Sequence, residues 1–204
     1  MFAGLSKATF SALAGSGLLK KMASRYGMQR PGSFGRRFVA GESIADAIDV
    51  ARKLEQRGLH VTLDYLGEHQ KSREGVAEAT RAYIAIADAA IKAGISRNIS
   101  LKLTQLGLDI DRATAIDNVR RVLESVLGAD LFVRIDMESS AYTDETFETF
   151  ETLWSIGYRD IGIVVQAYLR KATEQVRRMN ALGARVRLVK GAYRESSKVA
   201  FPDI

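Results

Sequence analysis

Residues 185–195 read RVRLVKGAYRE, and their pattern guides the interpretation of the whole chain. Val186 and Leu188 alternate with arginines, which is the period of two that is typical of a β-strand. Gly191 then ends the strand and lets the backbone approach another group closely. A cation inside a strand needs a partner or a ligand. The segment therefore predicts either a salt-bridged edge strand or a strand that ends at a binding site.

Four earlier segments share this strand pattern, and a helical pattern precedes or separates them. The predicted strands are residues 59–66, 99–104, 131–136, 161–166 and 185–189. The predicted helices are residues 42–57, 72–93, 111–127, 144–155 and 170–182, with Thr143 as the N-cap of the fourth. Strands that alternate with helices predict a parallel sheet built from right-handed βαβ units.

The spacing of the strands favours a barrel. They recur about every 31 residues, and eight such units fill the roughly 250 residues of a (β/α)8 barrel. A doubly wound sheet is complete with five strands, but no glycine-rich dinucleotide fingerprint follows the first strand here. We therefore predict an α/β fold, an incomplete TIM-like barrel of about five βα units that follows an N-terminal helical arm. Such a chain, expressed alone, is expected to be poorly soluble or oligomeric, and inactive.

Each predicted strand is apolar at alternate residues, and the remaining positions carry polar side chains. The apolar set is expected to pack on the outer helices, and the polar set to line the mouth of the barrel. That polar set comprises Asp64, Lys102, Arg134, Asp136, Gln166 and Arg187. An alternative for Asp64 is a purely structural role, in which its side chain caps or pairs with a group nearby in the sequence. Lys102 needs a partner, which we predict to be Asp136, and this pair either holds the barrel geometry or positions a substrate.

Composition excludes several classes of protein and site. With 47% hydrophobic and 26% charged residues, the chain has the make-up of an ordinary globular protein. It has no cysteine, which excludes disulfides, thiolate metal sites and a cysteine nucleophile. Its two histidines, His60 and His69, cannot form a His-rich metal site, and we predict no metal site. No apolar run approaches the roughly 18 residues of a membrane span.

The charge is concentrated in one segment. Residues 1–41 hold seven lysines and arginines and no acidic residue, so the net charge of +6 leaves −1 for the remainder. A nearly neutral body argues against nucleic acid as a partner. We predict two parts: residues 1–41 as a basic helical arm and linker, and residues 42–204 as the barrel. The arm has the composition of a transit peptide, of a segment packed on the body, or of one that contacts an anionic membrane.

Five ordered motifs closely resemble the proline dehydrogenases, especially the monofunctional bacterial kind. They read LDYLGE, SLKLTQLGLDID, FVRIDMESS, IGIVVQAYL and RVRLVKGAYRE, and the resemblance covers essentially the whole chain. It implies a distorted (β/α)8 barrel that binds FAD and oxidises L-proline to Δ1-pyrroline-5-carboxylate, with a membrane quinone as electron acceptor. Family members continue through three more strands and a helix with a Tyr-x-x-Arg-Arg motif. The resemblance therefore implies a chain that lacks the C-terminal third.

The resemblance also assigns roles to individual residues. It implies that Asp136 and Arg187 are catalytic and that Lys102 and Tyr193 bind the substrate. The residues that it places against FAD are Met137, Gln166, Arg187, Val189, Lys190, Gly191 and Ala192. It further implies a cytoplasmic protein, with peripheral contact on the inner face of the membrane through the basic arm.

Two other functions remain open from the residues alone. One is a barrel lyase that forms a Schiff base with its substrate through Lys102 or Lys190, which borohydride trapping would reveal. The other is a non-catalytic, truncated remnant. The flavin absorbance of the purified protein separates both from a flavoenzyme.

Overall fold

The structure is a computed structural model that describes residues 39–95 and 98–202. The chain divides into two compact units, Met1–Val50 and Ala51–Ile204. The predicted N-terminal helices and linker lie outside the described residues. Helix α3 (Ile44–Glu55) crosses the division, and Ser43 Oγ donates to Asp46 Oδ2 at 2.8 Å just before its first turn.

The second unit contains a sheet of five parallel strands, whose order in the sheet is their order in the sequence. They are β1 (Leu63–Asp64), β2 (Asn98–Leu101), β3 (Phe132–Ile135), β4 (Ile161–Gln166) and β5 (Arg185–Val189). A doubly wound sheet reverses its strand order at one point, whereas the wall of a (β/α)8 barrel does not. This order confirms the predicted fold, part of a TIM-like barrel.

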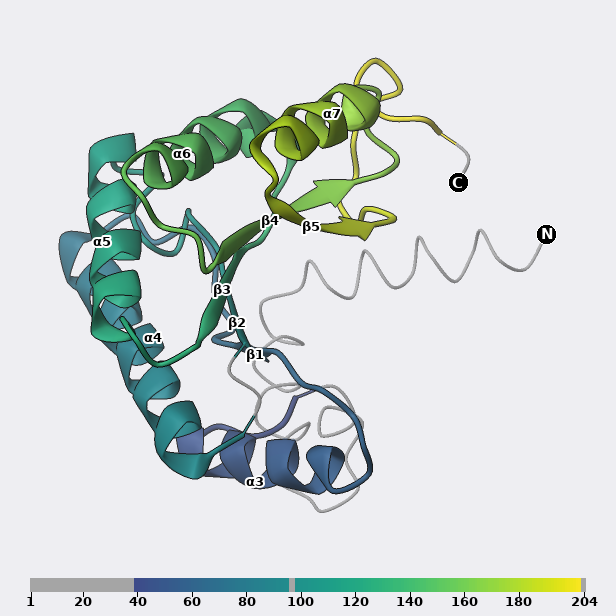
Figure 1. The fold of residues 1–204 in the computed structure, drawn as a ribbon. Coiled ribbons are helices and arrows are strands. Elements are labelled where there is room, and N and C mark those ends of the chain that lie inside the picture. Colours follow the sequence, from purple (N-terminus) through teal and green to yellow (C-terminus); the bar gives the residue numbers. More distant parts are fainter. Residues whose placement is uncertain (1–38, 96–97, 203–204) are drawn as a thin grey trace, which may run out of the picture. The chain divides into compact units, whose positions relative to one another are not determined.

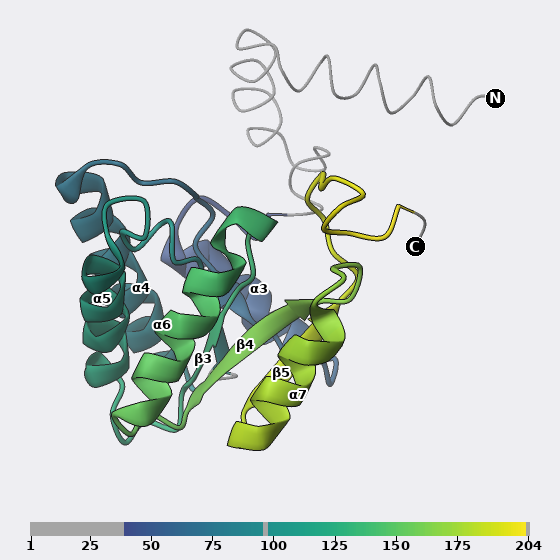
Figure 2. The ribbon, with the colours of Figure 1, turned by 90° about the horizontal axis from the view of Figure 1, so that it is seen from above.

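Four helices follow one another around one face of the curved sheet, as Figures 1 and 2 show. They are α4 (Arg73–Ala93), α5 (Arg112–Ser125), α6 (Thr143–Ser155) and α7 (Ala172–Leu182), and the short 3-10 helix η2 (Ser140–Tyr142) precedes α6. No helix among residues 39–95 and 98–202 is long and apolar enough to span a membrane.

The core lies between the sheet and these helices. The strand residues with no exposed surface belong to the predicted apolar set: Ile99, Leu101, Val133, Ile135, Ile161, Ile163 and Val165. Phe147 and Phe150 of α6 are buried with them. Leu188 was predicted to pack in the same way, but this prediction is wrong, since Leu188 is 62% exposed. The reason is that β5 is an edge strand, which pairs only with β4 in the described sheet.

Beyond shifts of one or two residues at the helix ends, the observed elements differ from the predicted ones at three places. Strand β1 has two residues rather than eight. Strand β2 ends at Leu101, because a turn begins at Lys102, whose carbonyl accepts from Gln105 N at 3.2 Å. The predicted N-cap Thr143 is wrong, since it is the first residue of α6 and Tyr142 precedes it without a side-chain cap. Here η2 leads directly into α6 and takes the place of a capping residue.

Gly162 on β4 leaves no room for a side chain. A Cβ at this position would lie 2.5 Å from Phe132 Cζ and 2.7 Å from the Arg185 carbonyl oxygen. Because that oxygen is backbone of the neighbouring strand, Gly162→Ala should lower the free energy of unfolding by about 1–3 kcal/mol, measured by urea denaturation.

The control for this prediction is Gly75→Ala in α4. Its Cβ would meet the flexible end of Gln70, and alanine favours a helix over glycine. This variant should be as stable as the parent chain or more stable. Equal losses at Gly162 and Gly75 would contradict the account of the sheet.

Candidate active site

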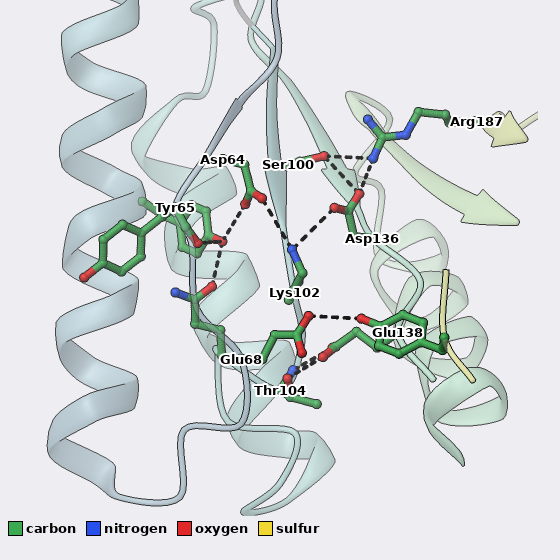
Figure 3. Close-up of polar contacts among 12 residues, drawn as sticks. Asp64, Tyr65, Glu68, Ser100, Lys102, Thr104, Asp136, Glu138 and Arg187 are labelled. Atoms are coloured by element: carbon green, nitrogen blue, oxygen red, sulfur yellow. Dashed lines mark hydrogen bonds and ion pairs between the residues drawn. The ribbon is translucent and has the colours of Figure 1, made fainter. Parts of the chain in front are cut away.

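Asp136, directly after β3, is the centre of a polar network on the face of the sheet opposite the helices (Figure 3). Its Oδ1 accepts hydrogen bonds from Ser100 Oγ at 3.0 Å and from Arg187 Nη2. Its Oδ2 lies 3.8 Å from Lys102 Nζ. Residues of β2, β5 and the turn after β2 therefore meet at one carboxylate.

Lys102 lies between two carboxylates. Its Nζ is 3.4 Å from Asp64 Oδ2 and 3.8 Å from Asp136 Oδ2, and its side chain is only 16% exposed. The structure thus contains the predicted Lys102–Asp136 pair. It also gives Asp64 a long-range partner, 38 residues away, in place of the local cap considered from the sequence. A largely buried cation with two acidic partners has its charge compensated.

Burial and charge act in opposite directions on Asp136. Burial raises the pKa of Asp136 and is the largest influence, while the Arg187 and Lys102 cations and the Ser100 hydroxyl lower it. The net direction is upward from the ordinary value. The carboxylate is therefore held where burial disfavours its charge, and the two cations offset this effect only in part.

The same face of the sheet carries two further arginines, and two arginine donor atoms on this face are unused. Arg134 and Arg185 each lie 4.9 Å from the centre of the Phe132 ring. Burial lowers the pKa of Arg134, and the Arg187 cation adds to this effect. Arg134 Nη1 and Arg187 Nε are buried without a hydrogen-bond partner among the described residues. This face is therefore rich in donors that a polar or anionic ligand can use.

Gln166, at the end of β4, links two loops at the mouth of the barrel. The side chain is buried, and its Nε2 donates to the Glu138 carbonyl at 2.8 Å. Its Oε1 accepts from Ala192 N at 3.4 Å. The amide predicted to contact the cofactor thus holds the segment after β3 next to the segment after β5.

The segment after β5 is fixed by its contact with the loop after β4. Ala167 N donates to the Val189 carbonyl at 2.7 Å, and Tyr168 N donates to the Lys190 carbonyl at 3.1 Å. Gly191 has a φ of +115°, and a Cβ there would lie 2.3 Å from the Tyr168 ring. The close approach predicted for Gly191 is therefore an approach to an aromatic ring, and only glycine fits.

Tyr193 connects this segment to the loop after β1. Its hydroxyl donates to Glu68 Oε1 at 3.0 Å, and its carbonyl accepts from the Tyr168 hydroxyl at 3.0 Å. Burial raises the pKa of Tyr193, and the bond to Glu68 adds to the increase. Met137 follows Asp136 but is 6% exposed and belongs to the core. Its predicted contact with a cofactor remains a prediction.

Sequence reasoning missed several residues of the network. Ser100 and Glu138 carried a usable signal, because Ser100 alternates with Lys102 and Glu138 follows Asp136 by two positions. Tyr83 carried none: it lies on α4, and its hydroxyl donates to Gln105 Oε1 at 2.9 Å and to Asp64 at 3.4 Å. A helix-to-strand contact of this kind is visible only in three dimensions.

The site as a whole is polar, with acidic and basic side chains paired, and it lies at the carboxyl ends of parallel strands. Three predicted residues, Lys102, Asp136 and Arg187, lie in one network, and Tyr193 and Gln166 border it. In (β/α)8 barrels this end of the strands is where substrates and cofactors bind and react. The geometry therefore defines the candidate active site of a barrel enzyme.

Comparisons with known proteins agree with this class. The family model for proline dehydrogenase matches residues 47–200. Proline dehydrogenase 1 of Bacillus subtilis (strain 168) is 39% identical over 188 residues, which cover 91% of this chain and 60% of the relative. The proline dehydrogenase of Deinococcus radiodurans is 35% identical over 179 residues, covering 86% of this chain and 58% of the relative.

A solved structure leads to the same family. The crystal structure of proline utilization A from Bdellovibrio bacteriovorus, inactivated by N-propargylglycine, matches with a TM-score of 0.70 and 29% identity. The match covers 78% of this chain and 20% of that protein. The chain belongs to the proline dehydrogenase family, and it spans about 60% of the length of the Bacillus subtilis relative.

Glu138 predicts a pH dependence of stability. It is 1% exposed, it accepts from Thr104 N at 3.1 Å and from Thr104 Oγ1, and burial raises its pKa above the ordinary 4.5. A group whose pKa is higher in the folded state stabilises the fold fully below its unfolded pKa. That contribution is lost as the pH rises through the folded value. Urea unfolding at a series of pH values should show Glu138→Gln gaining stability relative to the parent chain as the pH rises above about 4.5.

The exposed Glu78 of α4 provides the control, because Glu78→Gln removes a carboxyl group from the surface. This variant should follow the parent chain at every pH. A constant difference between Glu138→Gln and the parent chain would mean that Glu138 is not destabilised by burial.

Proposed function

We propose that this chain supplies the substrate- and flavin-binding part of an oxidoreductase that converts L-proline to Δ1-pyrroline-5-carboxylate. Membership of the proline dehydrogenase family supports the reaction. The observation that carries the proposal is that Lys102 and Arg187 both contact the carboxylate of Asp136 at the mouth of the barrel. The reaction needs no nucleophile from the protein. It needs a bound substrate in a fixed position and an electron acceptor.

We propose FAD as the cofactor, and Arg187 fits this role. Its guanidinium contacts Asp136, yet its Nε is buried without a partner among the described residues and its side chain is 38% exposed. It therefore has donors left for a further polar ring. When bound, FAD would supply the acceptor for a hydride from the proline carbon next to the nitrogen. The residues proposed to hold it are Met137, Gln166, Arg187, Val189, Lys190, Gly191 and Ala192.

The protein's own residues position the reactants. Asp136 holds Arg187 through Nη2, and this orients the guanidinium towards the mouth of the barrel. Lys102, held between Asp64 and Asp136, presents a cation that suits the carboxylate of an amino acid. Tyr193, anchored on Glu68, borders the same space and limits the size of the substrate.

The proposed electron acceptor is a membrane quinone, and the proposed location is the cytoplasm, with peripheral contact on the inner face of the membrane. The charge of residues 1–41 supports this location, because seven cations without an acid are attracted to anionic lipid. Apart from residues 39–41, this arm lies outside the described residues.

The contacts of Lys102 argue against the Schiff-base alternative. A lysine that attacks a carbonyl must give up its ion pairs, and Lys102 has two of them in a largely buried position. Lys190 is exposed on the segment after β5. Borohydride reduction in the presence of a carbonyl substrate, the class that a Schiff-base lyase requires, should therefore leave the mass of both lysines unchanged.

Arg187→Met tests the proposal directly. The experiment uses two forms of the protein: the 204-residue chain alone, and the same chain joined to the segment that follows the matched region in the Bacillus subtilis relative. Each form is loaded with FAD, and the reduction of the flavin by L-proline is followed by the flavin absorbance. Loss of a positioned cation should slow flavin reduction on the order of 100-fold, while the dissociation constant for FAD stays within about tenfold of the parent value.

Arg185→Met is the matched control, because Arg185 lies two residues earlier on β5 and stacks on Phe132 instead of contacting Asp136. Its flavin should be reduced at close to the parent rate. Unchanged reduction in Arg187→Met would overturn the assignment of Arg187. Absence of flavin binding in both forms of the parent protein would favour the non-catalytic remnant.

A further inference from the structure

A pocket lies between the first turns of α6 and α7, apart from the polar network of the candidate active site. Its volume is about 360 Å³, and its lining contains none of the residues proposed to bind the substrate or the cofactor. Thr143 and Asp144 come from the start of α6, whereas Leu169 and Gln175 come from the loop after β4 and from α7. Residues 198–199 complete the lining. A volume of this size suits a small organic molecule.

The two helices are neighbours in the wall of the barrel, as Figures 1 and 2 show. Arg178 on α7 forms an ion pair with Glu151 on α6, and Lys171 Nζ lies 3.5 Å from Asp144 Oδ1. The helices of a (β/α)8 barrel follow one another around the sheet in chain order. A helix that followed β5 would therefore pack on the side of α7 that faces away from α6, and it would leave this pocket in place.

Two buried polar groups in the pocket lining lack hydrogen-bond partners. Thr143, the first residue of α6, is 5% exposed, and Gln175, in the first turn of α7, is 6% exposed. Thr143 Oγ1 and Gln175 Oε1 have no partner among the described residues. Most buried polar side chains have one, because an unpaired polar group away from water costs free energy. A ligand in the pocket would supply the missing partners.

The surroundings of the pocket favour negative charge. Neither α6 nor α7 has a side-chain hydrogen bond at its N-cap, and the N-terminus of a helix carries a partial positive charge. The nearby carboxylate of Glu195 accepts from the backbone N and the hydroxyl of Ser140. The lining itself has three cations and one acidic residue, namely Arg170, Lys171, Lys198 and Asp144. Cations therefore outnumber acids around the pocket.

We propose that this pocket binds a small organic molecule that carries a phosphate group. A hydroxyl and an amide can each donate to phosphate oxygens, and an amide can present either its nitrogen or its oxygen. Helix N-termini with arginine and lysine nearby are a common setting for phosphate. Inorganic phosphate fills only part of about 360 Å³, and Leu169 and Val199 offer apolar contacts for an organic part. The proposal does not rest on the oxidation of proline.

Titration with inorganic phosphate and with ribose 5-phosphate, followed by ³¹P NMR at constant ionic strength, tests the proposal. Both forms of the protein that serve in the flavin experiment are used, because every lining residue belongs to this chain. Each form should bind one phosphate per chain, and ribose 5-phosphate at least as tightly as inorganic phosphate. Thr143→Val and Gln175→Met should each weaken the binding of both probes at least about tenfold.

Thr149→Val is the matched control. Thr149 also lies on α6, is fully buried and has an Oγ1 without a partner among the described residues, but it is not part of the pocket lining. Both threonine variants remove an unpaired hydroxyl and keep the shape of the side chain. Thr149→Val should therefore bind phosphate as the parent chain does, and circular dichroism shows that each variant is folded.

A second control separates this pocket from the proposed flavin site. The joined form, loaded with FAD, should bind inorganic phosphate as tightly as it does without FAD, because the two sites share no residue. Competition by FAD would overturn the proposal of a separate site. Equal affinity in Thr143→Val and Thr149→Val, or no binding of either probe by the parent protein, would overturn it as well.

Discussion

The carboxylate of Asp136 is the constraint on which the mouth of this barrel depends. It lies where burial raises its pKa, and Lys102, Ser100 and Arg187 contact it from three directions. Loss of any one cation leaves a poorly compensated charge in a position that water reaches only in part. The turn after β2 is therefore held to the end of β3 by charge as well as by backbone hydrogen bonds, and the edge strand β5, which pairs with β4, is held to β3 by the Arg187–Asp136 contact.

Two chemically opposite regions lie next to each other because of this arrangement. Arg134 and Arg187 have unused donors on the inner face of the sheet, whereas the carboxylates of Glu68 and Glu138 offer acceptors at the rim. Both regions begin at the exit of β3, where Asp136 and Glu138 are two residues apart. Gln166 keeps them in place, because its amide holds the Glu138 backbone next to the segment after β5. A zwitterionic substrate suits a boundary of this kind, since its two charges need opposite partners.

Much of this arrangement was predictable from the period of two in the strands. Alternation alone placed Lys102, Asp136 and Arg187 on one face. The register confirms it, because it aligns Asp64, Ser100, Arg134, Gly162 and Arg185 across the five strands, and the three residues each lie two positions further along their strands. Alternation does not report what covers a strand, and so it failed for Leu188 on the edge strand. It also carries no information on contacts between a helix and a strand or between two loops. The bond from Tyr83 to Asp64 and the approach of His69 to Asp109 were for this reason not foreseen.

The most direct test of the central claim is a double-mutant cycle between Lys102→Met and Asp136→Asn, followed by the free energy of unfolding in urea. Because the side chains of Lys102 and Asp136 are only 16% and 17% exposed, we expect a coupling energy of roughly 1–3 kcal/mol between them. The exposed pair Asp88 and Lys92 on α4 is the reference, with an expected coupling of about 0.2–0.5 kcal/mol. A coupling between Lys102 and Asp136 that is no larger than this reference would contradict the account.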